Sequence, residues 1–222
     1  MIDELVDEFL GNQEVSNDYV NGIIRKVEDV IDYSNLSERY LCKTITKPYP
    51  ESFNKLQNNV SKIINDSYGS VVVRPKSFKY GGYITASLMY KYILNSLKDD
   101  SHIKTMLYVD TNVFMEDLKR FMNKDTFGDV GLKLEYSLDV LFKDIYEADF
   151  VFWDNFNLVN TQYEVDKLYE IFSRRYMHLK GNILYLCGKN KAELTNNFDE
   201  NLKDMLDLTE FYDLSRAELF IS

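Results

Sequence analysis

The chain has 222 residues, of which 45% are hydrophobic and 28% charged, and its formal net charge at neutral pH is −10. These values are typical of one globular domain with a buried core, and no apolar run approaches the roughly 20 residues that span a bilayer. The negative charge disfavours nonspecific binding to nucleic acid, so a protein partner is the stronger expectation and single-stranded DNA at a local basic patch a weaker one.

The first residues are acidic and amphipathic rather than basic and then apolar, and this start predicts a cytoplasmic protein without a secretory signal. Only two cysteines are present, Cys42 and Cys187, and they form no closely spaced pair. We therefore expect neither a disulfide nor a metal site.

Two or three short helices are predicted for the first 45 residues, because apolar side chains recur there at helical spacing. The candidate residues for binding a protein partner are Phe9, Leu10, Ile23, Ile24 and Val27. Prolines at positions 48 and 50 then break any helix. We place a boundary there, between a helical partner-binding segment at residues 1–47 and one larger domain at residues 48–222.

The larger domain alternates between helices and strands. We predict helices at residues 53–65, 84–97, 113–122, 134–146, 163–176 and 202–208, and strands at residues 70–74, 105–109, 150–153, 182–187 and 211–214. Residues 127–133 contain two glycines and are predicted to be a loop. Such alternation is typical of an α/β fold with a parallel sheet and helices on both faces.

The turn after the first predicted strand is the candidate phosphate-binding loop. A strand, a glycine turn and a helix are the context of the motif G-x-x-G-x-G-K-[ST], whose amides and lysine hold phosphates and whose hydroxyl holds magnesium. Aligned by the helix, the third glycine survives as Gly82, next to Gly81, but Tyr83 takes the lysine position and Ile84 the hydroxyl position. Neither side chain offers a positive charge or a ligand for a metal.

The third predicted strand ends in Asp154 and Asn155. An apolar strand followed by two carboxylates would hold magnesium and activate the attacking water in an ATPase. Here the second position is Asn155, an amide that cannot act as a base. Asp154 alone also fits a strand-end aspartate that caps the next turn.

The order of elements over residues 53–214 resembles the AAA+ domain of bacterial replicative helicase loaders of the DnaC/DnaI type. The resemblance is carried by residues 148–155, 165–176, 181–186 and 192–194. It implies a P-loop AAA+ fold, a role in DNA replication and a replicative DNA helicase as partner. The family's polar sensor residue falls on Gly188, and its late-helix arginine falls at or near Met205. These departures, with those in the loop, imply a pseudo-ATPase without ATP or magnesium as cofactor.

A basic cluster precedes the fourth predicted strand, at Arg174, Arg175 and Lys180. These cations are candidates for contact with single-stranded DNA or with a neighbouring subunit. The other interpretation is a solvated helix end, since cations suit a helix C-terminus.

The sequence thus favours a catalytically inactive, helicase-loader-like protein that binds its partner stoichiometrically and loads or modulates it. Two alternatives stay open. One is a divergent ATP-binding AAA+ ATPase that uses Lys79 and Asp154. The other is a structural subunit of a clamp-loader-like assembly, and a homo-oligomer is compatible with each hypothesis.

Overall fold

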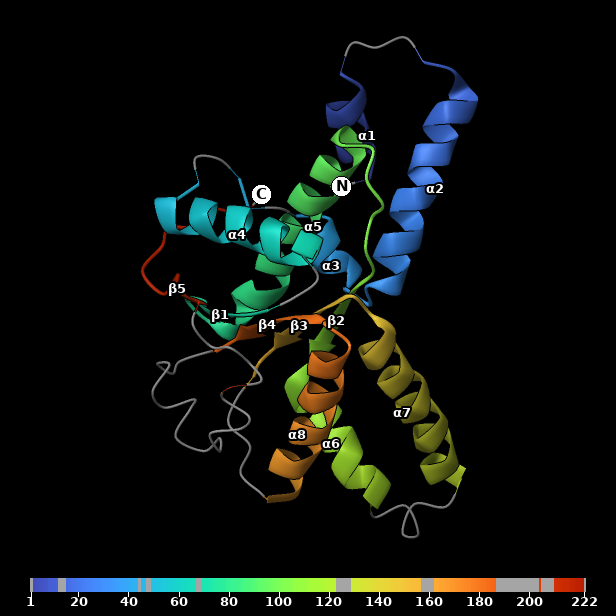
Figure 1. Ribbon diagram of the computed structural model, residues 1–222, viewed down its shortest axis with the longest axis vertical. Helices are drawn as coiled ribbons and strands as arrows, with labels where there is room; N and C mark the ends of the chain where they lie inside the picture. The colour runs from blue at the N-terminus through green and yellow to red at the C-terminus, as the bar shows by residue number, and fades with distance from the viewer. Residues whose placement is uncertain are drawn as a thin grey trace.

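The computed structural model describes residues 2–11, 15–43, 45–46, 49–66, 69–122, 129–156, 162–186, 204 and 210–221. Its centre is a five-stranded sheet in the order β2-β3-β4-β1-β5, with every neighbouring pair parallel (Figure 1). The strands are β1 (Ser70–Arg74), β2 (Met106–Asp110), β3 (Phe150–Asp154), β4 (Gly181–Tyr185) and β5 (Glu210–Asp213). The predicted α/β fold with a parallel sheet is confirmed.

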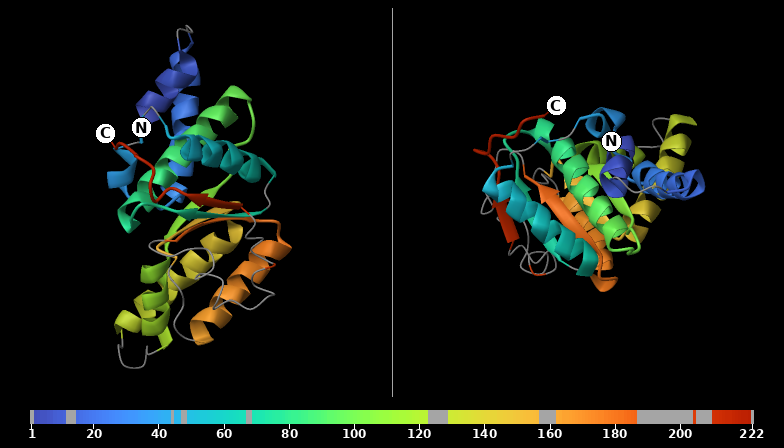
Figure 2. Two further views of the ribbon diagram at one scale, coloured as in Figure 1. Left: turned by 90° about the vertical axis from the view of Figure 1, so that its left-hand side faces the viewer. Right: turned by 90° about the horizontal axis from the view of Figure 1, so that it is seen from above.

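Helices cover both faces of this sheet (Figures 1 and 2). One face carries α4 and α5 with α1, α2 and α3 beyond them, and the other carries α6, α7 and α8. The bounds are α1 (Ile2–Leu10), α2 (Asn17–Tyr33), α3 (Glu38–Leu41), α4 (Glu51–Asp66), α5 (Gly81–Lys98), α6 (Thr111–Met122), α7 (Asp129–Glu147) and α8 (Gln162–Met177). The three helices α1, α2 and α3 lie within the first 45 residues, where two or three helices were expected.

Strands β1 to β4 are buried on both sides, and their side chains alternate between two cores. Val71 and Val73 join the cluster under α1 to α5, whereas Val72 joins the cluster under α6 to α8. Phe152 and Trp153 divide between the two clusters in the same way. Because successive side chains of a strand point to opposite faces, a continuous apolar run is what a sheet covered on both faces requires.

Helix α5 lies between the sheet and the N-terminal helices, and most of its side chains are buried. A helix that is apolar nearly all round is typical of such an interior position. The 3₁₀ helix η1 (Phe78–Tyr80) leads from β1 into α5. The start of α5 at Gly81 consequently lies at the carboxyl edge of the sheet.

The N-terminal helices have no core of their own. Val27 and Tyr40 belong to the same buried cluster as Phe53 and Val71. In addition, Ile45 forms an antiparallel bridge with the C-terminal segment. The break at position 48 therefore separates stretches of chain that share one hydrophobic core.

One predicted loop is wrong. Residues 127–133 were expected to be irregular because of their glycines, but α7 already begins at Asp129 and passes through Gly131. A glycine inside a helix costs only about 1 kcal/mol, which the rest of a 19-residue helix offsets. The predicted helix at 202–208 lies outside the described residues, apart from Asp204.

Candidate functional site

The candidate site lies where the carboxyl ends of β1, β2 and β3 meet the start of α5. Parallel strands bring their carboxyl ends to one edge, and ligands of open α/β sheets bind there. Asp110 and Asp154 are register partners at the ends of β2 and β3. The first amides of α5 would be donors for an anion at this edge.

Side chains of the protein itself pack against the two glycines at the start of α5. A Cβ built on Gly82 would lie 2.5 Å from the ring of Tyr40, and one built on Gly81 would clash with the carboxylate of Asp154. The two glycines thus allow a close approach to the backbone, as in a phosphate-binding loop. Here the approaching groups are Tyr40 and Asp154.

Tyr40 comes from the short helix α3 and sits in an aromatic cluster. Its ring meets Tyr83 edge-on at 5.0 Å between centroids, and Tyr108 at 6.2 Å. The guanidinium of Arg39 lies 4.4 Å from the Tyr40 ring centroid and also donates a hydrogen bond to the Tyr40 hydroxyl. Such contacts hold the ring over the start of α5.

Asp154 is almost completely buried, and both of its oxygens accept hydrogen bonds. The Tyr108 hydroxyl donates to Oδ2, and the backbone N–H of Asn155 donates to Oδ1 at 2.8 Å. Burial raises the pKa of Asp154 to about 6, although the two hydrogen bonds act in the opposite direction. Ionised at neutral pH, this carboxylate complements the positive end of the α5 dipole.

Asn155 joins the ends of two strands instead of facing a reacting water. Its side-chain amide donates to Asp110 Oδ2 at 3.1 Å. The other oxygen of Asp110 caps α6, accepting from the N–H groups of Asn112 and Val113. Asn155 has φ 51°, a left-handed conformation that asparagine tolerates.

The other residues of the predicted loop differ in exposure. Ile84 is fully buried, Tyr83 is half-buried, and Lys79 is exposed in the 3₁₀ turn. The next hydroxyl along the helix, that of Thr85, bonds to Tyr185 of β4 at 3.0 Å. Gly188 and Met205, the positions that the resemblance assigns to a sensor residue and an arginine, lie outside the described residues.

Sequence reasoning missed Tyr40 and Tyr108. Nothing local in the sequence connects Tyr40 with a loop some 40 residues away. The sequence could have placed Tyr108 near the end of a predicted strand, two residues before Asp110. Knowledge that this strand neighbours β3 would have been needed to bring it to Asp154.

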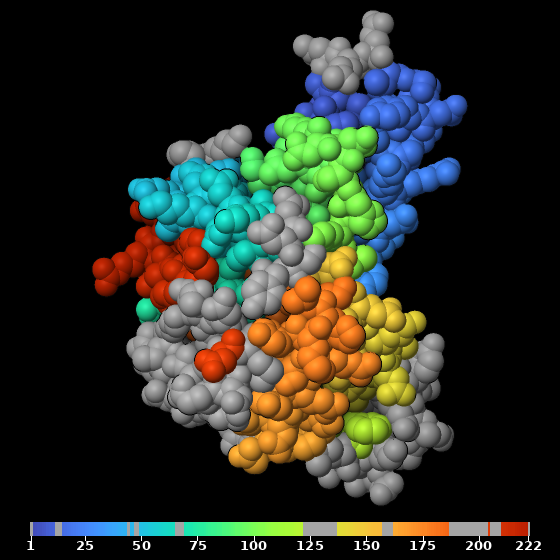
Figure 3. Space-filling model, viewed as in Figure 1, coloured from blue at the N-terminus to red at the C-terminus, as the bar shows by residue number. Residues whose placement is uncertain are grey.

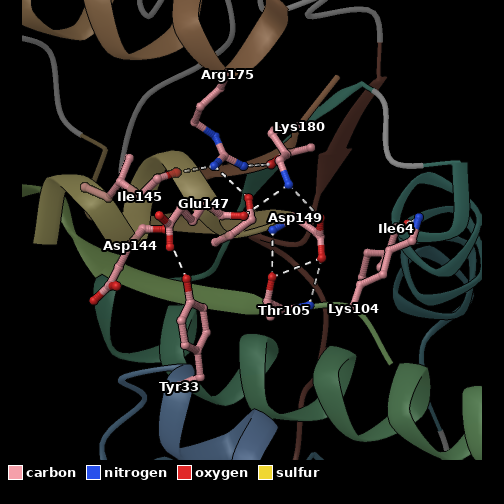
Figure 4. Close-up of polar contacts among 12 residues, drawn as sticks. Tyr33, Ile64, Lys104, Thr105, Asp144, Ile145, Glu147, Asp149, Arg175 and Lys180 are labelled. Atoms are coloured by element: carbon pink, nitrogen blue, oxygen red, sulfur yellow. Dashed lines mark hydrogen bonds and ion pairs between the residues drawn. The ribbon is translucent and has the colours of Figure 1, made fainter. Parts of the chain in front are cut away.

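The basic cluster before β4 divides in the structure. Arg175 is fully buried, and its guanidinium donates to the carbonyl oxygen of Ile145 (Figure 4). It also donates to the carbonyl oxygens of Ala148 and Gly181 and to the side chain of Asn182. A contact between Arg175 and DNA or a neighbouring subunit is therefore wrong. Arg174 is exposed and Lys180 half-buried, and their contact with DNA or a subunit stays a prediction.

The predicted partner-binding residues divide as well. Ile23 and Val27 are buried in the common core, which corrects their assignment to an exposed surface. Phe9, Leu10 and Ile24 are only partly buried. These three keep accessible apolar surface on α1 and α2.

Two searches of the described residues are negative. They contain no group of three or more His, Cys, Asp or Glu side chains arranged to hold a metal ion. None of their helices is both long and apolar enough to cross a membrane.

No protein-family model matches the chain, and no curated protein matches it significantly. Solved structures do match. The DnaC helicase loader has a TM-score of 0.56 at 15% identity, over 80% of this chain and 99% of that one. DnaI has a TM-score of 0.53 at 11% identity, over 81% and 95%. AMPPCP-bound DnaA from Aquifex aeolicus has a TM-score of 0.52 at 12% identity, over 74% and 47%. The chain therefore shares the fold of these DnaC, DnaI and DnaA structures.

Proposed function

We propose that this chain is a cytoplasmic replication protein that binds a replicative DNA helicase stoichiometrically and does not hydrolyse ATP. One observation carries the proposal: the Tyr40 ring and the Asp154 carboxylate pack against Gly82 and Gly81 at the start of α5. A phosphate bound by the first amides of α5 would require the same space. The protein's own groups therefore compete with a nucleotide for this position.

The bonding of Asp154 supports the same conclusion. A magnesium ion held by this carboxylate would have to displace the hydrogen bond from Tyr108 or from Asn155. Restoring a catalytic base would also require the amide of Asn155 to leave Asp110. A nucleotide would thus have to reorganise a buried cluster before any chemistry began.

The fold supports the proposed partner. Loader structures of the DnaC and DnaI type share it, and Phe9, Leu10 and Ile24 offer apolar surface on the N-terminal helices. Without an ATP-driven switch, such a protein acts by preferring one helicase conformation through binding energy alone.

The nucleotide test is a calorimetric titration with ATP and magnesium. We expect no binding by the wild type, and no hydrolysis by the double variant Tyr83→Lys, Ile84→Thr, because Asp154 and Asn155 remain engaged elsewhere. The double variant must keep the wild-type melting temperature to be informative. Micromolar affinity of the wild type, about −8 kcal/mol, would instead support a divergent ATPase that uses Lys79 and Asp154.

The partner test is co-elution of the chain with the replicative helicase of its own host in size-exclusion chromatography. We expect Ile24→Glu, on the partly exposed side of α2, to weaken the complex at least about tenfold. Val113→Glu on α6 is the matched control, since Val113 is 55% exposed on the opposite face of the sheet. Equal affinities of the two variants would contradict a role for the N-terminal helices.

A further inference from the structure

The turn between α8 and β4 contains a leucine in an unfavourable backbone conformation. Helix α8 ends in a Schellman turn, in which Lys180 N–H donates to Arg175 O at 2.9 Å and Leu179 N–H donates to Tyr176 O at 3.0 Å. This turn gives Leu179 a φ of 53°. Glycine is the usual residue at that position, because a Cβ is strained there.

Burial does not compensate this strain. In the part of the chain that the structure describes, the other non-glycine residues with positive φ are Asn35, Asp100 and Asn155, which are types that tolerate it. Leu179 is 59% exposed, and nearby Met177 is 71% exposed. A large apolar side chain at a strained, exposed position indicates a use outside the folded chain.

We call Met177, His178 and Leu179 the α8 knob. Two cations flank it and are held in place: Lys180 Nζ lies 2.7 Å from Asp149 Oδ1, and the Arg174 guanidinium lies 4.2 Å from the Tyr146 ring centroid. Helix α8 lies at the surface of the molecule (Figure 3). The knob is thus an apolar projection with basic neighbours, on a protein of net charge −10.

A complementary groove lies between α2 and the segment that joins α5 to β2. Its volume is about 510 Å³, and its apolar lining consists of Phe9, Tyr19, Ile23, Val30, Leu97 and Ile103. Asp29 and Asp100 line it as well, together with Lys26 and His102. This α2 groove is built by α1, α2 and the end of α5 with the segment after it, and its two aspartates outnumber its one lysine. The groove therefore suits apolar side chains that carry cations beside them.

The knob and the groove are close to each other at the amino edge of the sheet, away from Gly81. Lys180, next to the knob, bonds to Asp149, whose other oxygen accepts from the N–H and the hydroxyl of Thr105 at 3.1 and 3.0 Å (Figure 4). Thr105 itself lines the α2 groove. Two complementary features on one face satisfy the requirement for a closed two-fold dimer, in which each copy offers both.

We propose that this chain forms a two-fold dimer in which Met177 and Leu179 of each copy insert into the α2 groove of the other. The acidic side chains of the groove, Asp29 and Asp100, then face the cations beside the knob. A second copy thus binds both through apolar contacts and through opposite charges. The dimer does not depend on the nucleotide state of the candidate site.

The test is light scattering coupled to size-exclusion chromatography over a wide concentration range, combined with thermal melting. We expect a dimeric wild type and a monomeric Leu179→Gly variant whose melting temperature, compared as monomers at low concentration, is about 2–4 °C higher, since glycine relieves the strain. Asn35→Gly, also at positive φ, is the matched control and should remain dimeric.

A second variant tests the groove. Tyr19 is 52% exposed on the groove wall, and Tyr19→Ala should also give a monomer. A wild type that stays monomeric throughout the range would overturn the proposal, as would a dimeric Leu179→Gly variant. Loss of helicase binding by Leu179→Gly in a chain that never dimerises would also overturn it, and would assign the knob to the helicase.

Discussion

Replacing Arg175 with alanine is expected to lower the free energy of unfolding by about 4 kcal/mol or more. The guanidinium is fully buried and donates to the carbonyl oxygens of Ile145 and Ala148, at the end of α7, and of Gly181, at the start of β4. Without it, the buried carbonyl oxygens of Ile145 and Ala148 lose this donor, at about 1–3 kcal/mol each, whereas the Gly181 oxygen lies within the β3–β4 ladder. The loss is therefore a large part of the 5–15 kcal/mol that typically stabilises a domain.

The neighbouring arginine supplies the control. Arg174→Ala removes an exposed side chain stacked on Tyr146, and the expected loss is below about 1 kcal/mol. Urea unfolding of both variants measures the difference, and Arg175→Lys shows how much depends on the planar, multidentate guanidinium. Similar losses at positions 174 and 175 would mean that the buried hydrogen bonds contribute little.

A second large effect is expected in the pH dependence of stability, through Asp154. Its pKa is raised to about 6 in the folded protein, mainly by burial, against an ordinary value near 4. Below about pH 4 the group is protonated in both states. As the pH rises to about 7, the unfolded state releases the proton more easily, so the wild type loses up to about 3 kcal/mol of stability through this group.

The variant Asp154→Asn cannot titrate at this position and should not show that loss. The stability difference between the variant and the wild type is expected to shift by about 3 kcal/mol in favour of the variant between pH 4 and pH 7.5. Urea unfolding at the two pH values measures this shift. Asp166→Asn, at an exposed position on α8, is the matched control. Parallel stability curves for Asp154→Asn and the wild type would rule out a raised pKa.

The fold was predictable because its strands carry a strong local signal. The apolar runs at residues 71–73 and 150–153 sit in a sheet that is covered on both faces, so their position required no knowledge of distant residues. The start of α7 was missed because glycine is only a weak helix breaker when neighbouring turns support the helix.

The candidate site was only partly predictable. The positions of Gly82, Tyr83 and Asp154 follow from local strand, turn and helix order. That Tyr40 fills the space over Gly82 depends on how α3 packs, and no local pattern reports such a contact. Arg174 and Arg175 are adjacent residues of the same type, so the sequence does not distinguish them. One is exposed and the other buried because they project from different sides of α8.

The strand order also affects how this chain folds while it is being synthesised. Strand β1 lies between β4 and β5, whose residues are synthesised more than 100 positions later. At about 5–20 residues per second, the valines of β1 wait roughly 5–20 seconds for a neighbour. During that interval an apolar strand without a partner edge is exposed to aggregation. If synthesis pauses before residue 181, β1 is still unpaired, and we expect chaperones to bind the nascent chain.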